Sequence, residues 1–205
     1  MEIMYVKKAS TNYFSSKNFI GFYGEIKDLT VLLDEIKITT IKKNSKVSRY
    51  IPKNKMYNQI LNITADLLKK KTNDLSYGEY KLALLLYTIS LEPEVIILNN
   101  FDLGFNSKIK SKISKLIKTV NAEHKTNFII ISNDINFINK TTKHIIISKN
   151  KVIKYQGDIL TAIKQGFIDK PPIITFIDMA NEKGANLEYT LDNKELLKGI
   201  YRSVF

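Results

Sequence analysis

Residues 75–106 read LSYGEYKLALLLYTISLEPEVIILNNFDLGFN, and this stretch decides the fold. Segment 76–91 is rich in leucine and predicts a helix that the following proline ends. Residues 95–98 (VIIL) form a continuous apolar run, which is typical of a buried strand. Ser76 and Gly78 stand at the start of the helix, where backbone N–H groups without helical partners can hold an anion. Alone, a serine at this place indicates only an ordinary helix cap.

Apolar runs and helical patterns alternate outward from this stretch. Helices are expected at 29–33, 58–71, 76–91 and 107–120, and strands at 19–23, 36–41, 47–51, 95–98, 128–132, 144–148 and 152–155. Strands of near-continuous Val and Ile that alternate with helices predict an α/β fold, with a mostly parallel sheet flanked by helices. The last two strands flank Asn150-Lys151 and predict a hairpin.

After Gly157 the pattern changes to helices alone, expected at 173–181 and 192–201. We therefore expect one domain over residues 1–157 and a small helical C-terminal extension over residues 158–205.

The composition excludes several classes of protein. A chain of 205 residues with 44% apolar and 25% charged residues can bury an ordinary core and is not mostly disordered. The absence of cysteine excludes a disulfide scaffold and a thiolate metal site, and with only His124 and His144 a multi-histidine metal centre is excluded too. The sequence contains no run of eighteen apolar residues, so it predicts no membrane-spanning helix, and the first ten residues lack the apolar core of a secretory signal. We therefore expect a cytoplasmic protein.

The formal net charge is +12, and lysine carries almost all of the surplus. Such a surplus is consistent with nucleic acid, with an acidic membrane face or with no specific partner. Arginine, which base contacts and bidentate phosphate contacts favour, occurs only at Arg49 and Arg202. In residues 108–118 (KIKSKISKLIK) the lysines lie between apolar residues at helical spacing, which indicates the solvated face of an amphipathic helix. Nucleic acid is therefore the disfavoured partner.

The stretch 75–106 resembles the ATP-binding-cassette (ABC) ATPases. Residues 75–79 (LSYGE) are similar to the family signature LSGGQ, which is followed by a helix, a proline, a four-residue apolar strand and the Walker B acids. Other segments match the family in the same order: 21–28 (GFYGEIKD) stands at the phosphate loop, 49–53 (RYIPK) resembles the strand into the Q-loop, 128–134 (FIIISND) the strand into the switch-histidine loop, and 144–157 the closing hairpin. The tail, with Pro171-Pro172, is most similar to that of energy-coupling-factor transporter ATPases.

The resemblance implies a P-loop NTPase-like fold with a trimmed helical subdomain. The intervals from Lys27 to Lys53 and from Lys53 to Leu75 are shorter than those typical of the family. The nucleotide-facing β-subdomain and the helical subdomain, which contacts the transmembrane partner, are therefore expected to be reduced.

The phosphate loop departs from the family pattern G-x-x-x-x-G-K-[ST] at two positions. Ile26 replaces the glycine before Lys27, and a Cβ in a left-handed turn costs on the order of 1–2 kcal/mol. Asp28 replaces the hydroxyl residue that holds magnesium. Its carboxylate would repel a phosphate charge at about 4 Å by roughly 4 kcal/mol at an effective dielectric of 20, although a bound magnesium ion could invert this effect.

Asn99 and Asn100 stand where the family has the Walker B aspartate and the catalytic glutamate. An amide oxygen is a poorer magnesium ligand than a carboxylate, and an amide cannot take a proton from water, a step worth about 10²–10⁴-fold. The Q-loop, switch-histidine and D-loop positions carry Lys53, Asn133 and Asn106.

The resemblance therefore implies an own ATP site that is disabled for hydrolysis, with no catalytic residue and no resident metal. Two states of this site stay open. Either Gly21, Gly24 and Lys27 hold ATP, with or without magnesium, and no turnover follows, or these three residues only form a turn. Whether the chain counts as an enzyme depends on this point.

ABC ATPases act as face-to-face dimers in which each ATP lies between one subunit's phosphate loop and the other's signature. The resemblance implies that this chain lends Ser76 and the backbone amides near Gly78 and Glu79 to a second, competent ABC ATPase. A transmembrane transporter subunit at the inner face of the membrane is the further expected partner. A homodimer and a heterodimer both stay open.

Three other interpretations compete with this one. The chain could be a non-hydrolysing interaction or regulatory protein that retains only the scaffold. It could be a nucleic-acid-associated relative, which only the charge supports, or an active ATPase with unusual residues, which Asn99 and Asn100 disfavour.

Overall fold

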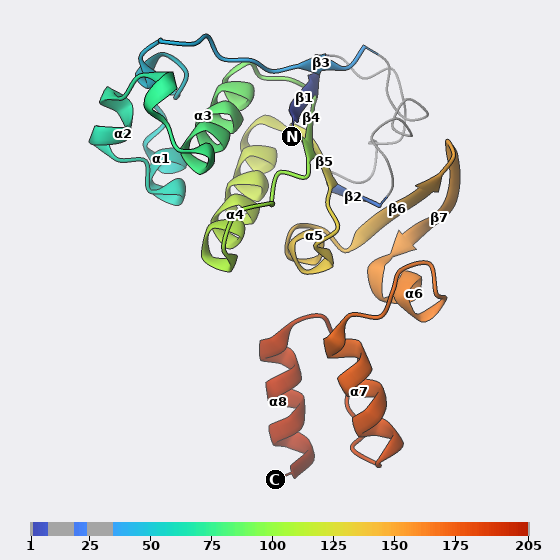
Figure 1. Ribbon diagram of the computed structural model, residues 1–205. Coiled ribbons are helices and arrows are strands. Elements are labelled where there is room, and N and C mark those ends of the chain that lie inside the picture. Colours follow the sequence, from blue (N-terminus) through green and yellow to red (C-terminus); the bar gives the residue numbers. More distant parts are fainter. Residues whose placement is uncertain (1, 8–18, 24–34, 205) are drawn as a thin grey trace.

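The computed structural model describes residues 2–7, 19–23 and 35–204 (Figure 1). These residues form a seven-stranded sheet in the order β3-β1-β4-β5-β2-β6-β7. The strands are β1 (Glu2–Val6), β2 (Phe19–Tyr23), β3 (Lys37–Ile38), β4 (Val95–Asn99), β5 (Asn127–Ile131), β6 (His144–Lys149) and β7 (Val152–Asp158). The neighbours β4, β5, β2 and β6 run parallel, whereas β1, β3 and β7 pair antiparallel at the two edges. The parallel prediction thus holds for the centre of the sheet.

The central strands are buried on both faces. In β4, Ile96 and Leu98 join one apolar cluster, whereas Val95 and Ile97 join a second cluster on the opposite face. Because successive side chains of a strand point to opposite faces, a strand covered on both sides must be apolar at every position. This requirement explains the continuous Val/Ile/Leu runs of β4 and β5.

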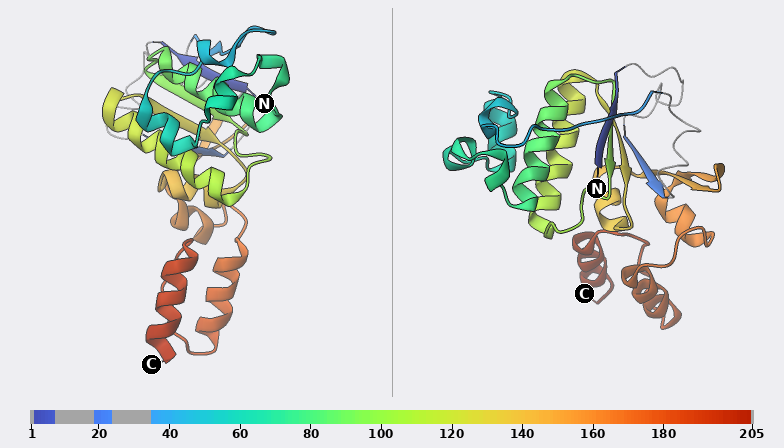
Figure 2. Two further views of the ribbon diagram at one scale, coloured as in Figure 1. Left: turned by 90° about the vertical axis from the view of Figure 1, so that its left-hand side faces the viewer. Right: turned by 45° about the horizontal axis from the view of Figure 1, so that its top comes forward.

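Helices α3 (Tyr77–Ser90) and α4 (Ser107–His124) lie side by side on one face of the sheet (Figures 1 and 2). The short helices α1 (Lys55–Leu61) and α2 (Ala65–Lys69) lie outside them, and α5 (Ile135–Thr141) follows β5. The helices predicted at 76–91 and 107–120 and the hairpin after residue 144 are confirmed. In the turn between β6 and β7, Asn150 and Lys151 both have positive φ, of 54° and 61°, as a two-residue hairpin turn requires.

The predicted strand at 47–51 is wrong. Val47–Arg49 forms a 3₁₀ turn, which the bond from Tyr50 N to the Val47 carbonyl closes at 2.9 Å. Val47 and Ile51 are both buried. Their spacing of four residues puts apolar side chains on one side of a helical turn, and a strand would need a spacing of two. The strand predicted at 36–41 shrinks to the two residues of β3.

The single helix predicted at 58–71 is wrong because two caps divide it. Asn62 ends α1 in the left-handed conformation at φ 57°, and Thr64 begins α2 by accepting a hydrogen bond from Leu67 N at 3.2 Å. The helix predicted at 29–33 lies outside the described residues. Between β3 and α3 the chain therefore forms two short helices, α1 and α2, in place of one long helix.

The C-terminal region contains α6 (Ile159–Lys164), α7 (Pro172–Glu182) and α8 (Asn193–Val204). Helices α7 and α8 stand side by side as a hairpin that projects from the body (Figures 1 and 2). Ile159, Ile163, Ile174 and Ile177 belong to the same apolar cluster as α3 and α4. The division of the chain at residue 157 stays a prediction.

Helix α5 packs directly on the backbone of β2 at Gly21. A Cβ at this position would overlap the Cγ2 methyl of Ile138 and would lie 3.3 Å from the His144 carbonyl oxygen. We therefore expect Gly21→Ala to lower the free energy of unfolding by about 1–3 kcal/mol through overpacking. Urea unfolding of the purified protein measures this loss.

A double-mutant cycle tests the contact itself. Ile138→Ala removes the obstructing methyl group, so the double variant should lose less than the sum of the two single losses. Gly104→Ala, where an added Cβ meets nothing within 4 Å, should add to Ile138→Ala without coupling. Additive losses for Gly21→Ala and Ile138→Ala would contradict the packing of α5 on β2.

Candidate functional site

The start of α3 is held by a reciprocal cap. The Ser76 hydroxyl accepts a hydrogen bond from Glu79 N at 3.3 Å, and the Glu79 carboxylate accepts one from Ser76 N at 2.8 Å. Lys70 Nζ lies 2.7 Å from the other Glu79 oxygen. Its hydrogen bond, together with that of Ser76 N, holds the pKa of Glu79 below its ordinary value. The capping box thus fixes both Ser76, which is exposed, and Glu79.

Gly78 lets this helix start approach the turn that follows β4. A Cβ on Gly78 would lie 3.3 Å from the Phe105 ring. Tyr77 stands in the place of a signature glycine, and its side chain is 61% exposed. The structure therefore brings Ser76, Gly78 and Glu79 together on one short, exposed helix start.

Two amides occupy the carboxyl end of β4. The Asn100 side chain donates to Asn99 Oδ1 at 3.4 Å, and Asn100 N donates to the Ile131 carbonyl of β5 at 2.8 Å. Asn100 adopts the left-handed conformation with φ 49°, which asparagine tolerates better than most residues. A carboxylate is absent from both positions, so neither side chain can act as a general base at neutral pH.

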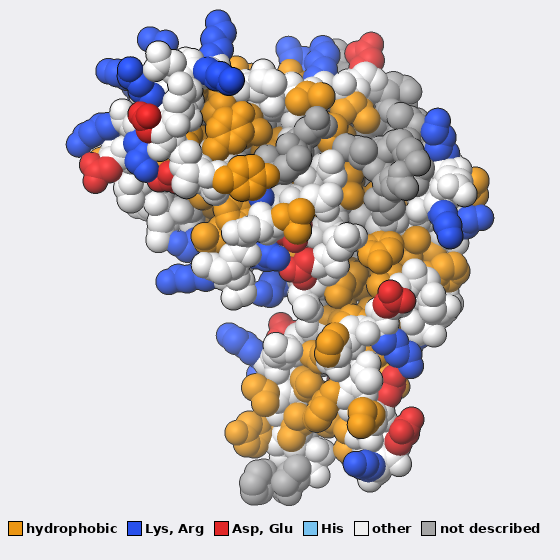
Figure 3. All heavy atoms as spheres, in the orientation of Figure 1, with side chains coloured by type: hydrophobic (Ala, Val, Ile, Leu, Met, Phe, Trp, Pro, Cys, Tyr) orange, Lys and Arg blue, Asp and Glu red, His pale blue; other side chains and the backbone are white. Residues whose placement is uncertain are grey.

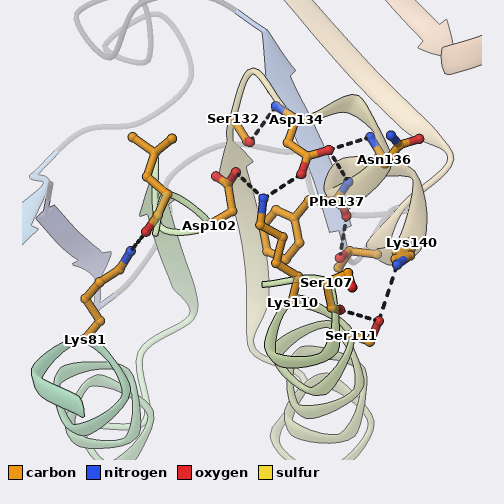
Figure 4. A network of polar contacts seen from close by, with 12 residues as sticks. Lys81, Asp102, Ser107, Lys110, Ser111, Ser132, Asp134, Asn136, Phe137 and Lys140 are labelled. Carbon is orange, nitrogen blue, oxygen red and sulfur yellow. Dashed lines mark hydrogen bonds and ion pairs between the residues drawn. The ribbon is translucent and has the colours of Figure 1, made fainter. Parts of the chain in front are cut away.

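Two acids from the segments that follow β4 and β5, Asp102 and Asp134, pair with Lys110 of α4 (Figure 4). Lys110 Nζ lies 2.7 Å from Asp134 Oδ2 and 3.4 Å from Asp102 Oδ2. Burial raises the pKa of Asp134, but the hydrogen bond and charge of Lys110, together with the hydrogen bonds from the backbone amides of Phe137 and Asn136, outweigh it, so this pKa lies below its ordinary value. Burial likewise lowers the pKa of Lys110, and the contacts with Asp134 and Asp102 outweigh it, so that pKa is raised. In the described residues, the other oxygen of the buried Asp102 carboxylate has no hydrogen-bond partner.

Lys81 links α3 to the turn after β4. Its side chain is fully buried, and Nζ donates to the Leu103 carbonyl at 2.6 Å. The ammonium also lies 4.3 Å from the ring centre of Phe105 and 5.0 Å from that of Phe101. Burial lowers the pKa of Lys81 to about 8, against the opposing charge of Asp102. This contact holds the turn at 100–105 against the helix that carries Ser76.

The remaining predicted site residues are distributed as follows. Gly21 lies inside β2 and is buried, while Gly24 and Lys27 lie outside the described residues. Lys53 and Asn133 are exposed. Asn106, at the D-loop position, caps α4 by accepting a hydrogen bond from Ile109 N at 2.9 Å.

Sequence reasoning missed the network of Lys81, Asp102, Lys110 and Asp134. One signal was present, because Lys81 stands on the same helical face as Leu84, Leu85 and Thr88, where a solvated lysine does not belong. The described residues bring no three His, Cys, Asp or Glu side chains together in a way that could hold a metal ion. No helix in that part of the chain has the length and apolar character to span a membrane.

Comparisons with known proteins agree with this geometry. No family model matches the sequence. The energy-coupling factor transporter ATP-binding protein of Ureaplasma parvum is 27% identical over 168 residues, which are 76% of this chain and 56% of the relative. The chain spans about half the length of the curated relatives it matches.

Solved structures show the fold. An ATP-binding cassette of an ABC transporter in its ADP conformation aligns with a TM-score of 0.53 at 16% identity, over 87% of this chain and 99% of the cassette. An ATP-binding subunit of another ABC transporter aligns with a TM-score of 0.56 at 11% identity, over 88% and 100% of the two chains. The fold expectation from the sequence is confirmed.

The buried position of Lys81 predicts a pH-dependent stability. Since its pKa is about 8 in the folded chain and near 10.5 when unfolded, the unfolded state binds more protons between these values. The free energy of unfolding of the native chain should therefore rise relative to that of Lys81→Met as pH increases from 8 to 10.5, by at most about 1.4 kcal/mol per pH unit.

Urea titrations at pH 7, 8, 9 and 10 measure this difference. Lys115→Met, at an exposed position of α4, is the matched control for the loss of a lysine. A native-minus-Lys81→Met difference that stays flat over this range would contradict the desolvated position of Lys81.

Proposed function

The chain is a homologue of the energy-coupling factor transporter ATP-binding proteins with the fold of an ABC ATPase, and we propose that it is a catalytically degenerate subunit of a transport complex. In this proposal it pairs with a competent ABC ATPase and supplies the signature side of one composite ATP site. The observation that carries the proposal is the contrast between two edges of the same domain: an ordered, exposed helix start at Ser76 and a β4 end that carries only amides.

The start of α3 suits the donated role. Amides in the first turn of a helix have no carbonyl partner within the helix, and the helix dipole favours an anion there. The capping box uses Ser76 N and Glu79 N, so the amides of Tyr77 and Gly78 are left to face a ligand. The Lys70 ammonium neutralises the Glu79 carboxylate, which would otherwise repel an anion at this helix start. A phosphate group presented by a second subunit would find a ready anion site.

The chain's own ATP site could bind a nucleotide but could not hydrolyse it. Asn100 cannot take a proton from water, and Lys110 engages both Asp102 and Asp134. We propose that Gly21, Gly24 and Lys27 hold any nucleotide. ATP, with or without magnesium, would then stay unhydrolysed in this half of the dimer.

The partners follow from the same proposal. The competent ATPase makes a heterodimer, and a transmembrane subunit of the transporter holds the pair at the inner face of the membrane. The choice of transported substrate would belong to the membrane subunits.

One observation favours the alternative, a regulatory or interaction protein without nucleotide. The α7–α8 hairpin exposes Phe176, Met179, Leu197 and Tyr201, each at least 49% exposed. Figure 3 shows apolar side chains gathered on this hairpin. A protein that acts only by contact could use such a surface while its ATP site stays idle.

Substitution of Ser76 separates the two functions. In a complex with a competent energy-coupling factor ATPase from the same genome, Ser76→Ala should lower ATP turnover by about 10- to 100-fold, since a hydrogen bond to a charged group is worth about 1.5–3 kcal/mol. Phosphate release by the assembled complex is the measurement.

Thr64→Ala removes an equivalent capping hydroxyl from α2, costs about 1 kcal/mol of stability and should leave turnover unchanged. Size-exclusion chromatography checks that each variant still assembles. Undiminished turnover by an assembled Ser76→Ala complex would reject the donated signature and favour the regulatory alternative.

A further inference from the structure

A broad groove runs between α4, α5 and the turn at 191–194 that leads into α8. Its volume is about 1170 Å³. Segments far apart in the sequence form this groove, so no local sequence motif predicts it. The lysines that line it are Lys110, Lys115, Lys118, Lys140, Lys143 and Lys194.

The groove is strongly positive. Six lysines face two carboxylates, those of Asp134 and Asp192. Lys110 neutralises Asp134 at 2.7 Å. The Asp192 carboxylate accepts a hydrogen bond from the backbone amide of Lys194 at 2.8 Å. Lys110 also lies 3.4 Å from the buried Asp102 carboxylate, so a surplus of three positive charges stays at the groove.

Neutral partners hold several of these ammonium groups in place. Lys118 Nζ donates to the Lys140 carbonyl at 2.7 Å, and Lys140 Nζ lies 3.3 Å from Ser111 Oγ. Lys143 Nζ donates to Asn139 Oδ1 at 2.8 Å. Figure 4 shows Lys140 and Ser111 across the gap between α5 and α4. These contacts orient the charges without cancelling them, which lowers the ordering cost of binding an anion.

The chemistry of the walls selects the kind of anion. Arginine is absent from the lining, so the bidentate contacts that favour phosphate and base edges are missing. The aromatic residues, Phe105 and Phe137, are only 9% and 1% exposed, so they offer no platform on which bases could stack.

On the α4 wall, the exposed small side chains of Ser107, Ser111 and Ala122 alternate with lysines, whereas Ser114 is buried against Thr141 of α5. Small residues let the backbone of a second helix come close, while lysines on both sides can pair with acidic residues. The wall from Ser107 to Ala122 is about 23 Å long at 1.5 Å per residue, which matches a helix of about four turns.

We propose that this groove is a docking site for an acidic helical segment of a partner protein, rich in Glu and Asp. The site uses residues other than Ser76 and the end of β4, so it does not depend on the proposed role of the chain in ATP turnover. The proposal gives the surplus of positive charge in the sequence a binding partner, which the composition alone does not identify.

A defined peptide tests this proposal. A sixteen-residue, Ala-based helix with Glu at every fourth position is titrated against the full chain by fluorescence anisotropy, next to the same peptide with Gln in place of Glu. We expect the Glu peptide to bind at least about tenfold more tightly at 50 mM salt and to weaken at 150 mM. Equal binding of the two peptides would overturn the proposal.

Paired charge reversals locate the contact. Lys115→Glu with Lys194→Glu changes two exposed walls of the groove, whereas Lys149→Glu with Lys154→Glu makes the same change in net charge on the exposed β6–β7 hairpin. The first pair should weaken binding of the Glu peptide by about tenfold, since it replaces two attractions by two repulsions. The second should change it less than twofold.

Two further results would contradict the proposal. Equal weakening by both pairs would mean that net charge alone attracts the peptide. Tighter binding of a sixteen-base-pair DNA duplex than of the Glu peptide, lost in the Lys115/Lys194 pair, would assign the groove to nucleic acid instead.

Discussion

The parallel pairing of β4 with β5 is the constraint on which the rest of the structure depends. Ile96 to Leu98 and Phe128 to Ile130 are fully buried between two apolar clusters, and Asn99 pairs in register with Ile131. Because both strands run the same way, their carboxyl ends meet at one edge of the sheet. Asn99 and Asn100 must therefore lie beside Ser132 and the loop that carries Asn133. The identity of these polar residues decides what chemistry the edge can perform.

Close to this edge, two lysines hold the turn that follows β4. Lys110 binds Asp102 and Asp134 and thereby ties the turn after β4 to the start of α5. Lys81 binds the Leu103 carbonyl and ties the same turn to α3. A buried charge costs free energy unless it is paired and hydrogen-bonded, and these two lysines meet the requirement through the turn. The turn after β4 is thus held from two sides, although Asn99 and Asn100 themselves carry no carboxylate.

The parts predicted best from the sequence are those in which one apolar pattern decides the structure. Helix α3, strands β4 and β5 and the β6–β7 hairpin follow directly from their patterns and caps. A run of five residues with Val47 and Ile51 apolar is too short to distinguish a strand from a helical turn, so the strand predicted at 47–51 is wrong. The helix predicted at 58–71 is wrong because Asn62 and Thr64 act as caps that divide it. The network around Lys110 and the lysine groove could not be predicted, since each joins side chains whose proximity only the tertiary fold creates. The sequence could place Ser76 and Glu79 together because their capping box is local, whereas the approach of Gly78 to Phe105 depends on the tertiary fold.

The central claim is that this ABC scaffold no longer cleaves ATP by itself. The most direct measurement is release of inorganic phosphate from saturating Mg-ATP by the purified chain alone, followed over hours beside a protein-free blank. The account predicts release no faster than in the blank, because Asn100 offers no base and Asp102 and Asp134 bind Lys110. Sustained release on the order of one phosphate per second per chain, an ordinary enzymatic rate, would contradict it.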